Sequence, residues 1–223
     1  CGACGFAGCD GYAAALIEGE GVKTNLCVPG GDAVAQGISE ILGVAFEDVV
    51  EQIAVVHCGG SKSVAARKAA YQGVQSCAAA KLVYGGENAC PFGCIGLGDC
   101  AAICPNGAIR IEDGIARIDT RRCTGCGMCA KVCPNRIIYT EADTITTVVT
   151  CCSTEKGAVT RKKCTHGCIG CKKCERECPA QAITVTNNLA KIDYEKCTGC
   201  GHCAEVCTTK CIEQASFAGI FRK

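Results

Sequence analysis

The sequence predicts an α+β fold of small modules dominated by metal sites, and three observations support this prediction. Cysteine supplies 26 of the 223 residues, and most of the cysteines fall into closely spaced runs. The runs recur 74 residues further along the chain, as from Cys123 to Cys197. Aromatic residues make up only 4% of the chain and Trp is absent, which leaves little material for an ordinary apolar core. We therefore expect metal binding to be coupled to folding.

Three of the cysteine runs share the spacing C-x2-C-x2-C-x3-C, and they begin at Cys123, Cys168 and Cys197. Proline follows the first two runs, whereas Thr208 follows the third. This is the spacing of bacterial ferredoxins, in which three thiolates bind one cluster and the fourth binds the other cluster of a pair. Disulfide bonds do not require three thiols two residues apart, and a zinc site would leave the third one surplus. The runs therefore predict [4Fe-4S] clusters in a reduced protein.

The repeat extends to eight cysteines and defines two modules. It carries one group of eight cysteines onto a second: Cys90, Cys94, Cys100, Cys104, Cys123, Cys126, Cys129 and Cys133 onto Cys164, Cys168, Cys174, Cys178, Cys197, Cys200, Cys203 and Cys207. The same offset maps Cys77 onto Cys151. We therefore expect tandem bacterial-ferredoxin-like 2[4Fe-4S] modules at 86–141 and 160–215, with a linker at 142–159 and a tail at 216–223.

Each module is expected to contain one β-hairpin and short helical turns. Apolar residues alternate with polar ones on both sides of Gly114 and of Asn187-Asn188, which is typical of hairpins. Long regular elements are not expected. The predicted strands are 108–111, 115–119, 182–186 and 189–193, and the predicted helical turns are 99–103 and 172–177.

The first 57 residues carry a different cysteine pattern and predict a separate helical domain. A helix is expected from Gly11 to Glu18, and a second over 33–42 with Asp32 as its N-cap. One long loop between cysteines suits a four-iron cluster, with two cysteine pairs around zinc as the alternative. The cysteines of this 1–57 domain are Cys1, Cys4, Cys9 and Cys27.

Residues 58–85 are predicted to connect this domain to the first module. The stretch from Lys62 to Leu82 is rich in alanine and predicts a helix that is interrupted near Gly73.

Crossed ligation assigns twenty cysteines to about five [4Fe-4S] clusters. One set is irregular because Leu97 occupies the position where the repeat predicts a cysteine. We take Cys90 as its fourth ligand, with Cys77 as the rival and a three-iron cluster as the further alternative. The predicted sets are Cys1, Cys4, Cys9 and Cys27; Cys90, Cys94, Cys100 and Cys133; Cys104, Cys123, Cys126 and Cys129; Cys168, Cys171, Cys174 and Cys207; and Cys178, Cys197, Cys200 and Cys203.

Six cysteines remain outside these sets: Cys58, Cys77, Cys151, Cys152, Cys164 and Cys211. Cys211 is interpreted as a buried thiol and Cys164 as a relic of the duplication. The other four would complete a sixth site if the modules fold together, and the sequence leaves this open. His57, His166 and His202 are expected to be solvated or packed rather than ligands.

The remaining features exclude several functions. The formal charge is +1 and there is no basic stripe with interleaved aromatics, so nucleic acid is not an expected partner. The chain has no nucleotide-binding glycine motif, no paired nucleophile and base, no signal peptide and no membrane-spanning apolar stretch. We therefore expect no catalytic site and no flavin or nicotinamide bound by this chain. Since it begins on Cys1, inside a motif, we expect a fragment without its natural N-terminus.

One basic group is a candidate docking site for an acidic partner, with a solvated face as the alternative. It consists of Arg161, Lys162, Lys163, Lys172 and Lys173.

Three segments together resemble the B subunit of the Rnf complex, in its longer, clostridial-type form. They are Cys1-Gly-Ala-Cys4-Gly-Phe-Ala-Gly-Cys9, Cys27-Val-Pro-Gly-Gly31, and the stretch from Cys58-Gly-Gly60 through Cys77 to Cys90-Pro-Phe-Gly-Cys94-Ile-Gly-Leu-Gly-Asp-Cys100.

The resemblance implies a subunit that accepts electrons from reduced ferredoxin and passes them into a membrane-bound ferredoxin:NAD oxidoreductase that exports Na⁺ or H⁺. It implies membrane subunits and flavin- or nicotinamide-binding subunits as further partners. It also implies a position on the cytoplasmic face of the membrane, with an N-terminal anchor helix that this fragment lacks. The alternatives are a polyferredoxin that serves a hydrogenase or a corrinoid-activating enzyme, and a zinc-bound assembly module without redox function.

Overall fold

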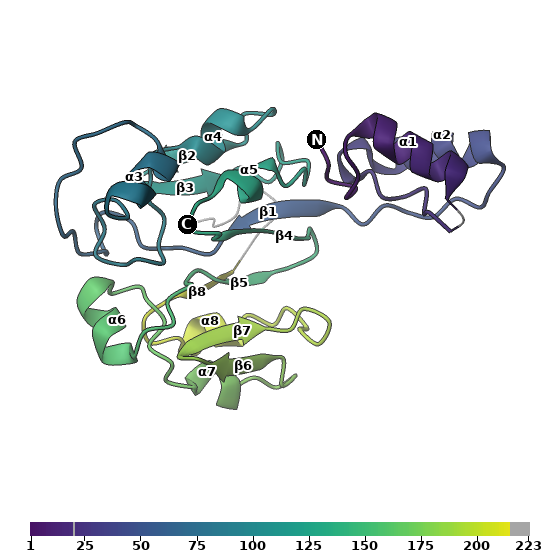
Figure 1. Ribbon diagram of the computed structural model, residues 1–223. Helices are drawn as coiled ribbons and strands as arrows, with labels where there is room; N and C mark the ends of the chain where they lie inside the picture. The colour runs from purple at the N-terminus through teal and green to yellow at the C-terminus, as the bar shows by residue number, and fades with distance from the viewer. Residues whose placement is uncertain (20, 215–223) are drawn as a thin grey trace.

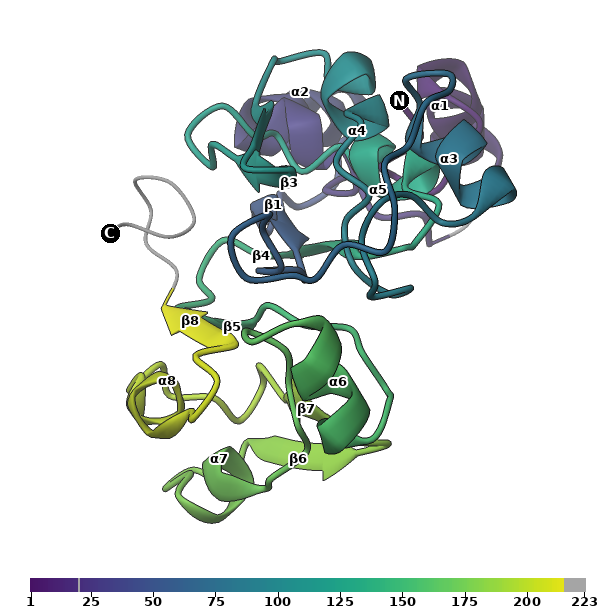
Figure 2. The ribbon, with the colours of Figure 1, turned by 90° about the vertical axis from the view of Figure 1, so that its left-hand side faces the viewer.

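The computed structural model describes residues 1–19 and 21–214, so that residue 215 and the predicted tail at 216–223 lie outside the described residues. Figure 1 shows three bodies: an N-terminal helical body on one side, and two small α+β bodies one above the other. Figure 2 shows that the two α+β bodies keep this arrangement after a quarter turn. We call them module 1 and module 2 in chain order.

The N-terminal body consists of α1 (Cys9–Glu18), the 3-10 turn η1 (Val28–Gly30) and α2 (Gly31–Leu42). The buried Tyr12 fixes it by donating a hydrogen bond to the carbonyl oxygen of Lys23 over 2.7 Å. Both predicted helices are present, but Asp32 is not the cap of the second one. Its carboxylate instead accepts from the backbone N–H of Val49 over 2.8 Å, and this bond ties the segment after α2 back to the helix.

Module 1 contains two antiparallel strand pairs and two short helices. The hairpin β2 (Ile109–Glu112) and β3 (Ile115–Ile118) was predicted from the sequence, as was α4 (Asp99–Ile103). The other pair joins β1 (Gln52–Val56) to β4 (Ile138–Ala142), with Val56 opposite Ile138. The second helix is α5 (Met128–Val132). β1 therefore forms a two-stranded sheet with β4 of module 1, although the sequence placed it in the N-terminal domain.

Module 2 repeats this plan. β5 (Thr147–Val149) pairs with β8 (Ile212–Gln214), and the predicted hairpin forms from β6 (Ile183–Thr186) and β7 (Leu189–Ile192). Asn187 and Asn188 both have positive φ, 50° and 63°, as a two-residue hairpin turn requires. The helices are α6 (Gly157–Lys163), α7 (Lys173–Arg176) and α8 (His202–Val206). The stretch predicted as a linker thus supplies β5 and the start of α6.

The strand pairing changes which cysteines are equivalent. Cys58 follows β1 and Cys151 follows β5, in each case with one residue between the strand and the cysteine, so these two are the structural counterparts. The sequence repeat instead matched Cys151 with Cys77. The reason is unequal insertions, since Cys58 lies 36 residues before Cys94 whereas Cys151 lies only 17 before Cys168.

The helix predicted from Lys62 to Leu82 is confined to α3 (Cys77–Val83). The alanine-rich segment before it is extended and crosses onto module 2. Ala65 forms an antiparallel bridge with Cys164, and the N–H of Ala66 donates to the carbonyl oxygen of Lys163 over 2.7 Å. Pairing with a distant segment therefore overrides the local helix propensity.

The modules also pack directly against each other. Ile53 and Val55 of β1 lie in one buried apolar cluster with Ile145 and Val148, and Tyr194 packs on its side. The N–H of Gly59 donates to the carbonyl oxygen of Thr150 over 2.9 Å. Within the described residues, no helix is long and apolar enough to cross a membrane.

Candidate iron–sulfur centres

All 26 cysteines lie within the described residues and none forms a disulfide. The described part of the chain contains no group of three or more His, Cys, Asp or Glu side chains that converges on one metal ion. Many of the sulfurs instead line small cavities beside the strand pairs, and the cavities determine which cysteines the fold brings together.

A cavity of about 20 Å³ in module 2 collects one predicted set. Cys174 lies on α7, while the other members lie on the preceding loop and after α8. Gly170 in that loop approaches the hairpin turn so closely that a Cβ there would lie 2.9 Å from Cα of Asn188. The loop is therefore held against the hairpin. The cysteines lining this cavity are Cys168, Cys171, Cys174 and Cys207, together with Cys211.

Cys211, which is buried, acts on two of these sulfurs. Its thiol lies 3.7 Å from Sγ of Cys207. Hydrogen bonding with Cys211 lowers the pKa of Cys207 to about 4 and that of Cys168 to about 6, because a thiol proton shared with either sulfur stabilises its thiolate. The expected buried thiol is thus also a hydrogen-bond partner of cluster-binding candidates.

Several buried candidate ligands have raised pKa values instead. Burial, followed by the charge of neighbouring sulfurs, raises the pKa of Cys174 and Cys129 to about 12. The same causes raise that of Cys203 to about 11, although a backbone hydrogen bond partly opposes them. Thiolates become stable at such positions when they bind a cation, so binding iron there would displace protons.

Backbone N–H groups point at several sulfurs of both modules. The N–H of Ala54 in β1 donates to Sγ of Cys123 over 3.3 Å. Cys104 and Cys178, the crossing cysteines, accept from the N–H groups four residues later, over 3.3 and 3.4 Å. Such bonds favour thiolates and tune the potential of a bound cluster.

The irregular set is arranged differently from the sequence prediction. A second cavity of about 20 Å³ is lined by Cys77, Cys94, Cys100 and Cys133. Cys90 lies elsewhere, so the structure brings the rival Cys77, and not Cys90, to this set.

Asp99 explains how Cys77 reaches this position. The Asp99 carboxylate accepts hydrogen bonds from the hydroxyl of Ser76 and from the backbone N–H groups of Cys77 and Ala78, at 2.9 to 3.0 Å. Burial acts against the charge, but these bonds outweigh it and lower the pKa of Asp99. The start of α3 is therefore fastened to α4, which carries Cys100.

Cys90 lies with four of the unassigned cysteines in a separate cavity of about 30 Å³ between the modules. The four are Cys58, Cys151, Cys152 and Cys164. The sequence left open a site of Cys58, Cys77, Cys151 and Cys152, whereas this cavity has Cys90 and Cys164 in place of Cys77. Nothing in the sequence shows that the segment after β1 crosses to module 2.

In the N-terminal body, Cys9 begins α1 and Cys27 precedes η1. The ring of Tyr12 stacks on Phe6, and the charges of Cys27 and Cys4 add to burial in raising its pKa. The amino group of Lys131 on α5 donates to the carbonyl oxygen of Cys1 over 3.2 Å. This contact joins the N-terminal body to the helix that carries Cys129.

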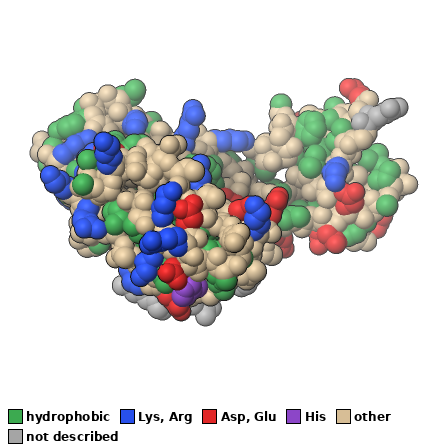
Figure 3. Space-filling view, turned by 90° about the horizontal axis from the view of Figure 1, so that it is seen from below, with side chains coloured by type: hydrophobic (Ala, Val, Ile, Leu, Met, Phe, Trp, Pro, Cys, Tyr) green, Lys and Arg blue, Asp and Glu red, His purple; other side chains and the backbone are tan. Residues whose placement is uncertain are grey.

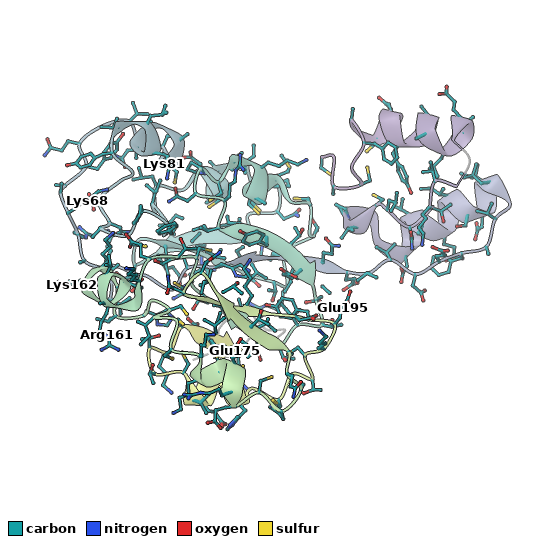
Figure 4. All side chains as sticks on the ribbon, turned by 60° about the horizontal axis from the view of Figure 1, so that its bottom comes forward. Lys68, Lys81, Arg161, Lys162, Glu175 and Glu195 are labelled. Atoms are coloured by element: carbon teal, nitrogen blue, oxygen red, sulfur yellow. The ribbon has the colours of Figure 1, made fainter. Side chains whose placement is uncertain are left out.

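The basic group of module 2 is only partly free for a partner. Lys163 forms an ion pair with Glu155 at 2.5 Å and Lys172 one with Glu175 at 3.8 Å. Lys172 and Lys173 line the cavity of Cys168. In Figure 4, Arg161 and Lys162 lie at the same end of the molecule as Lys68 and Lys81 of the connector. Figure 3 shows that Lys and Arg side chains gather over the two modules rather than over the N-terminal body.

Comparison with known families agrees with the two modules. Residues 92–137 and 167–211 each match a family described as a 4Fe-4S dicluster domain. A second family of the same description matches 122–183, a range that runs from one repeat into the next. Residues 1–29 match a family whose description names an Fe-S cluster. The tandem 4Fe-4S dicluster domains predicted from the sequence are confirmed.

Similar proteins identify a more specific family. The chain is 45% identical to the B subunit of the proton-translocating ferredoxin:NAD(+) oxidoreductase complex of Clostridium ljungdahlii, over 95% of this chain and 74% of that protein. It is 42% identical to the B subunit of the ion-translocating oxidoreductase complex of Methanosarcina acetivorans, over 96% of this chain and 81% of that protein. The chain belongs to this family of B subunits. The resemblance to the Rnf complex is thereby confirmed.

Within this family the coupling ion differs. The chain is also 39% identical to the B subunit of the Na(+)-translocating ferredoxin:NAD(+) oxidoreductase complex of Acetobacterium woodii, over 95% of this chain and 64% of that protein. Relatives of comparable similarity are thus named for protons and for sodium.

Proposed function

We propose that the chain is an electron-transfer subunit of an ion-translocating ferredoxin:NAD oxidoreductase complex, with [4Fe-4S] clusters held by its own cysteines. The observation that carries this proposal is that two cavities, one in each module, each bring together four cysteines from separate segments of the repeated cysteine pattern and its insertion. The names of the relatives support the complex. When bound, each cluster supplies one-electron transfer.

Five ligand sets follow from the spacing and the cavities. They keep the crossed pattern, with Cys77 replacing Cys90 in the irregular set. The proposed sets are Cys1, Cys4, Cys9 and Cys27; Cys104, Cys123, Cys126 and Cys129; Cys77, Cys94, Cys100 and Cys133; Cys168, Cys171, Cys174 and Cys207; and Cys178, Cys197, Cys200 and Cys203.

Contacts support an ordered path through these sets. Lys131 joins the N-terminal body to α5, and the charge of Cys100 acts on the pKa of Cys129, so neighbouring sets lie close together. In module 2 the charge of Cys178 acts on Cys203, so the crossing cysteine lies close to a member of its own proposed set. Module 1 thus keeps the thiols of two consecutive sets near one another, which short electron transfers require.

Reduced ferredoxin is the proposed electron donor, and membrane subunits and flavin- or nicotinamide-binding subunits are the proposed acceptors. We place the donor on the basic group of module 2, because Lys172 and Lys173 adjoin the Cys168 set and Arg161 and Lys162 extend the positive surface. Opposite charge steers encounter and raises association rates by about 10- to 1,000-fold. We also propose that the complex holds the chain at the membrane.

Stopped-flow reduction of anaerobically reconstituted protein by reduced ferredoxin tests this function. We expect reduction of the bound clusters, at a second-order rate that falls as salt rises towards about 0.1 M and beyond. The double variant Arg161→Glu with Lys162→Glu should slow it at low salt, whereas Lys23→Glu on the N-terminal body is the matched control. No reduction by ferredoxin with full cluster content would refute the donor, and an unchanged rate in the double variant would refute the docking site.

A further inference from the structure

The N-terminal body and the two modules carry charge of opposite sign. Residues 1–51 contain eight acidic side chains and one basic side chain, whereas residues 52–223 contain 22 basic and 14 acidic ones. The basic side chain of the first part, Lys23, forms an ion pair with Glu47 over 3.2 Å. The small total charge of +1 therefore results from two parts of opposite sign.

The helix α2 of the N-terminal body has its large apolar side chains on an exposed face. Val34, Ile38 and Ile41 follow one another at the i, i+4 and i+7 spacing of one helix face. Ile41 is 85% exposed and Val34 is 40% exposed. The buried residues of this helix are instead Ala35 and Ser39. The helix thus packs inward through small side chains and leaves an apolar stripe outside.

Acidic side chains share this surface with the apolar stripe. Glu40 lies beside Ile41 on the helix, and Phe46 and Asp48 are exposed in the segment that Asp32 ties back to it. Neither Glu40 nor Asp48 forms an ion pair within the described residues. Figure 3 shows hydrophobic and acidic side chains together on the N-terminal body. We call this surface the acidic face: Val34, Glu40, Ile41, Phe46 and Asp48.

The connector and α6 form a surface of the complementary kind. On α3, Leu82 is 89% exposed and Val83 is 69% exposed, beside Lys81. On α6, Arg161 and Lys162 are exposed. None of these three basic side chains forms an ion pair within the part of the chain that the structure describes. We call this surface the basic face: Lys68, Lys81, Leu82, Val83, Val159, Arg161 and Lys162.

Two contacts hold the parts of the basic face together. The N–H of Ala66 donates to the carbonyl oxygen of Lys163 over 2.7 Å, which places the connector beside α6. The amino group of Lys68 donates to the carbonyl oxygen of Tyr84 over 2.6 Å and lies 5.1 Å from the centre of its ring. This contact joins the connector to the end of α3. The basic face is therefore one continuous surface made by three segments.

The acidic and basic faces lie at opposite ends of the molecule. Figures 1 and 4 show the N-terminal body at one end, and α3, α6 and the labelled basic residues at the other. The bond of 3.2 Å from Lys131 to the carbonyl oxygen of Cys1 holds the N-terminal body beside α5. The acidic face therefore does not reach the basic face of its own chain. Since the two faces match in charge and in apolar content, a second copy offers the complementary surface.

We propose that the chain associates head to tail, with the acidic face of one copy on the basic face of the next. The exposed apolar side chains bury one another, and the carboxylates of one copy meet the ammonium and guanidinium groups of the other. With a Debye length of about 8 Å at physiological ionic strength, the side chains of the two faces act locally. Such a contact is heterologous, so it builds a chain of copies unless two copies close into a pair.

This association goes beyond the proposed function, because it requires neither ferredoxin nor electron transfer. It also has a consequence for that function. The basic face includes Arg161 and Lys162, on which we place the electron donor, so a second copy and reduced ferredoxin compete for the same surface.

Analytical ultracentrifugation of the full chain, isolated without oxygen, tests the association. At low salt we expect the mass to rise with protein concentration from that of one chain, 22.9 kDa without clusters, towards twice that value or more. At about 1 M ionic strength, where the Debye length is about 3 Å, we expect a monomer. A monomer at every concentration in low salt overturns the proposal, and so does association that salt does not weaken.

Charge reversal determines which faces meet. The double variants Lys81→Glu with Arg161→Glu, and Glu40→Lys with Asp48→Lys, should each weaken the association at least about tenfold, or about 1.4 kcal/mol. Glu205→Lys on α8 is the matched control outside both faces and should leave it unchanged. A mixture of the two double variants should associate again, because each reversed face then meets its reversed counterpart. No recovery in the mixture overturns the pairing of these faces.

Ferredoxin reduction gives a second measurement. Wild-type chain should be reduced with a lower second-order rate constant when it is concentrated at low salt, because neighbouring copies cover the basic face. The variant Glu40→Lys with Asp48→Lys keeps the basic face and should show no such decrease. Equal decreases in both proteins would overturn the proposal, whereas no reduction of either one at any concentration would overturn the proposed donor.

Discussion

Module 1 and module 2 share their strand pairing, but the fourth cysteine of one cavity comes from a different segment in each. Module 2 has Cys171 inside its run, whereas module 1 has Leu97 there and Cys77 of α3, in the insertion, lines its cavity. The two modules also differ at one buried position, where module 1 has Ile137 and module 2 has Cys211. In both modules the strand pairs and the hairpin position the cavity in the same way. The insertion in module 1 determines which segment supplies the fourth cysteine of that cavity.

The largest expected effect concerns both modules. Removal of iron by chelation should abolish the cooperative thermal transition of each, because few apolar side chains are available to hold the strand pairs without clusters. Calorimetry and amide exchange of the treated protein measure this. Protected amides in module 2 alone after complete iron loss would show that the modules differ in dependence on metal.

Removal of the fourth ligand should affect the modules equally. We expect Cys77→Ala and Cys171→Ala each to convert one [4Fe-4S] site into a three-iron site or to empty it, a loss of about one to four irons. EPR of the oxidised protein and iron analysis record the change. A three-iron signal in Cys90→Ala instead of Cys77→Ala would restore the ligand that the sequence favoured.

Substitution of Asp99 should change the stability and the cluster content of module 1 alone. Asp99→Ala removes the acceptor of three hydrogen bonds at the start of α3 and should lower the free energy of unfolding by about 1–3 kcal/mol. It should also release Cys77, which alkylation and EPR detect. Asp99→Asn is the matched control, since it keeps one acceptor oxygen, and equal loss in both variants would indicate that the charge rather than the bonds is decisive.

The smallest expected effect is a change in the reduction potential of one cluster in each module. Hydrogen bonds to cluster sulfurs raise reduction potentials, so Cys211→Ala should lower the potential of the Cys168 set by tens of millivolts, on the order of one hydrogen bond. Ile137→Cys is the reciprocal change in module 1 and should raise the potential of its counterpart. Redox titration followed by EPR measures the potentials of both variants. Unchanged potentials would show that Cys211 contributes only to packing.

The sequence predicted what depends on local spacing. The runs beginning at Cys123, Cys168 and Cys197 predicted the dicluster domains, and the alternation around Asn187-Asn188 predicted a hairpin. These features succeed because a few neighbouring residues determine them.

The failures all involve contacts distant in the chain. The choice of Cys90 rested on its position near Cys94 and stays a prediction, but Asp99 brings Cys77, 22 residues away, to the cavity of Cys94 and Cys100. β1 was assigned to the N-terminal domain because its partner begins only at Ile138. The segment around Ala65 was expected to be helical, yet it pairs with Cys164 across the module boundary. Propensity and spacing contain no information about such partners.

The pairing of β1 with β4 also affects how the chain is made. Gln52 lies opposite Ala142, so on the ribosome β1 must wait for β4, which at about 5–20 residues per second takes several seconds. The β2–β3 hairpin needs no such delay, because its strands are joined by a two-residue turn. During that interval Ile53 and Val55 have no strand beside them, and an apolar edge of this kind attracts other chains. Nascent module 1 is therefore prone to association with other chains until β4 has been made.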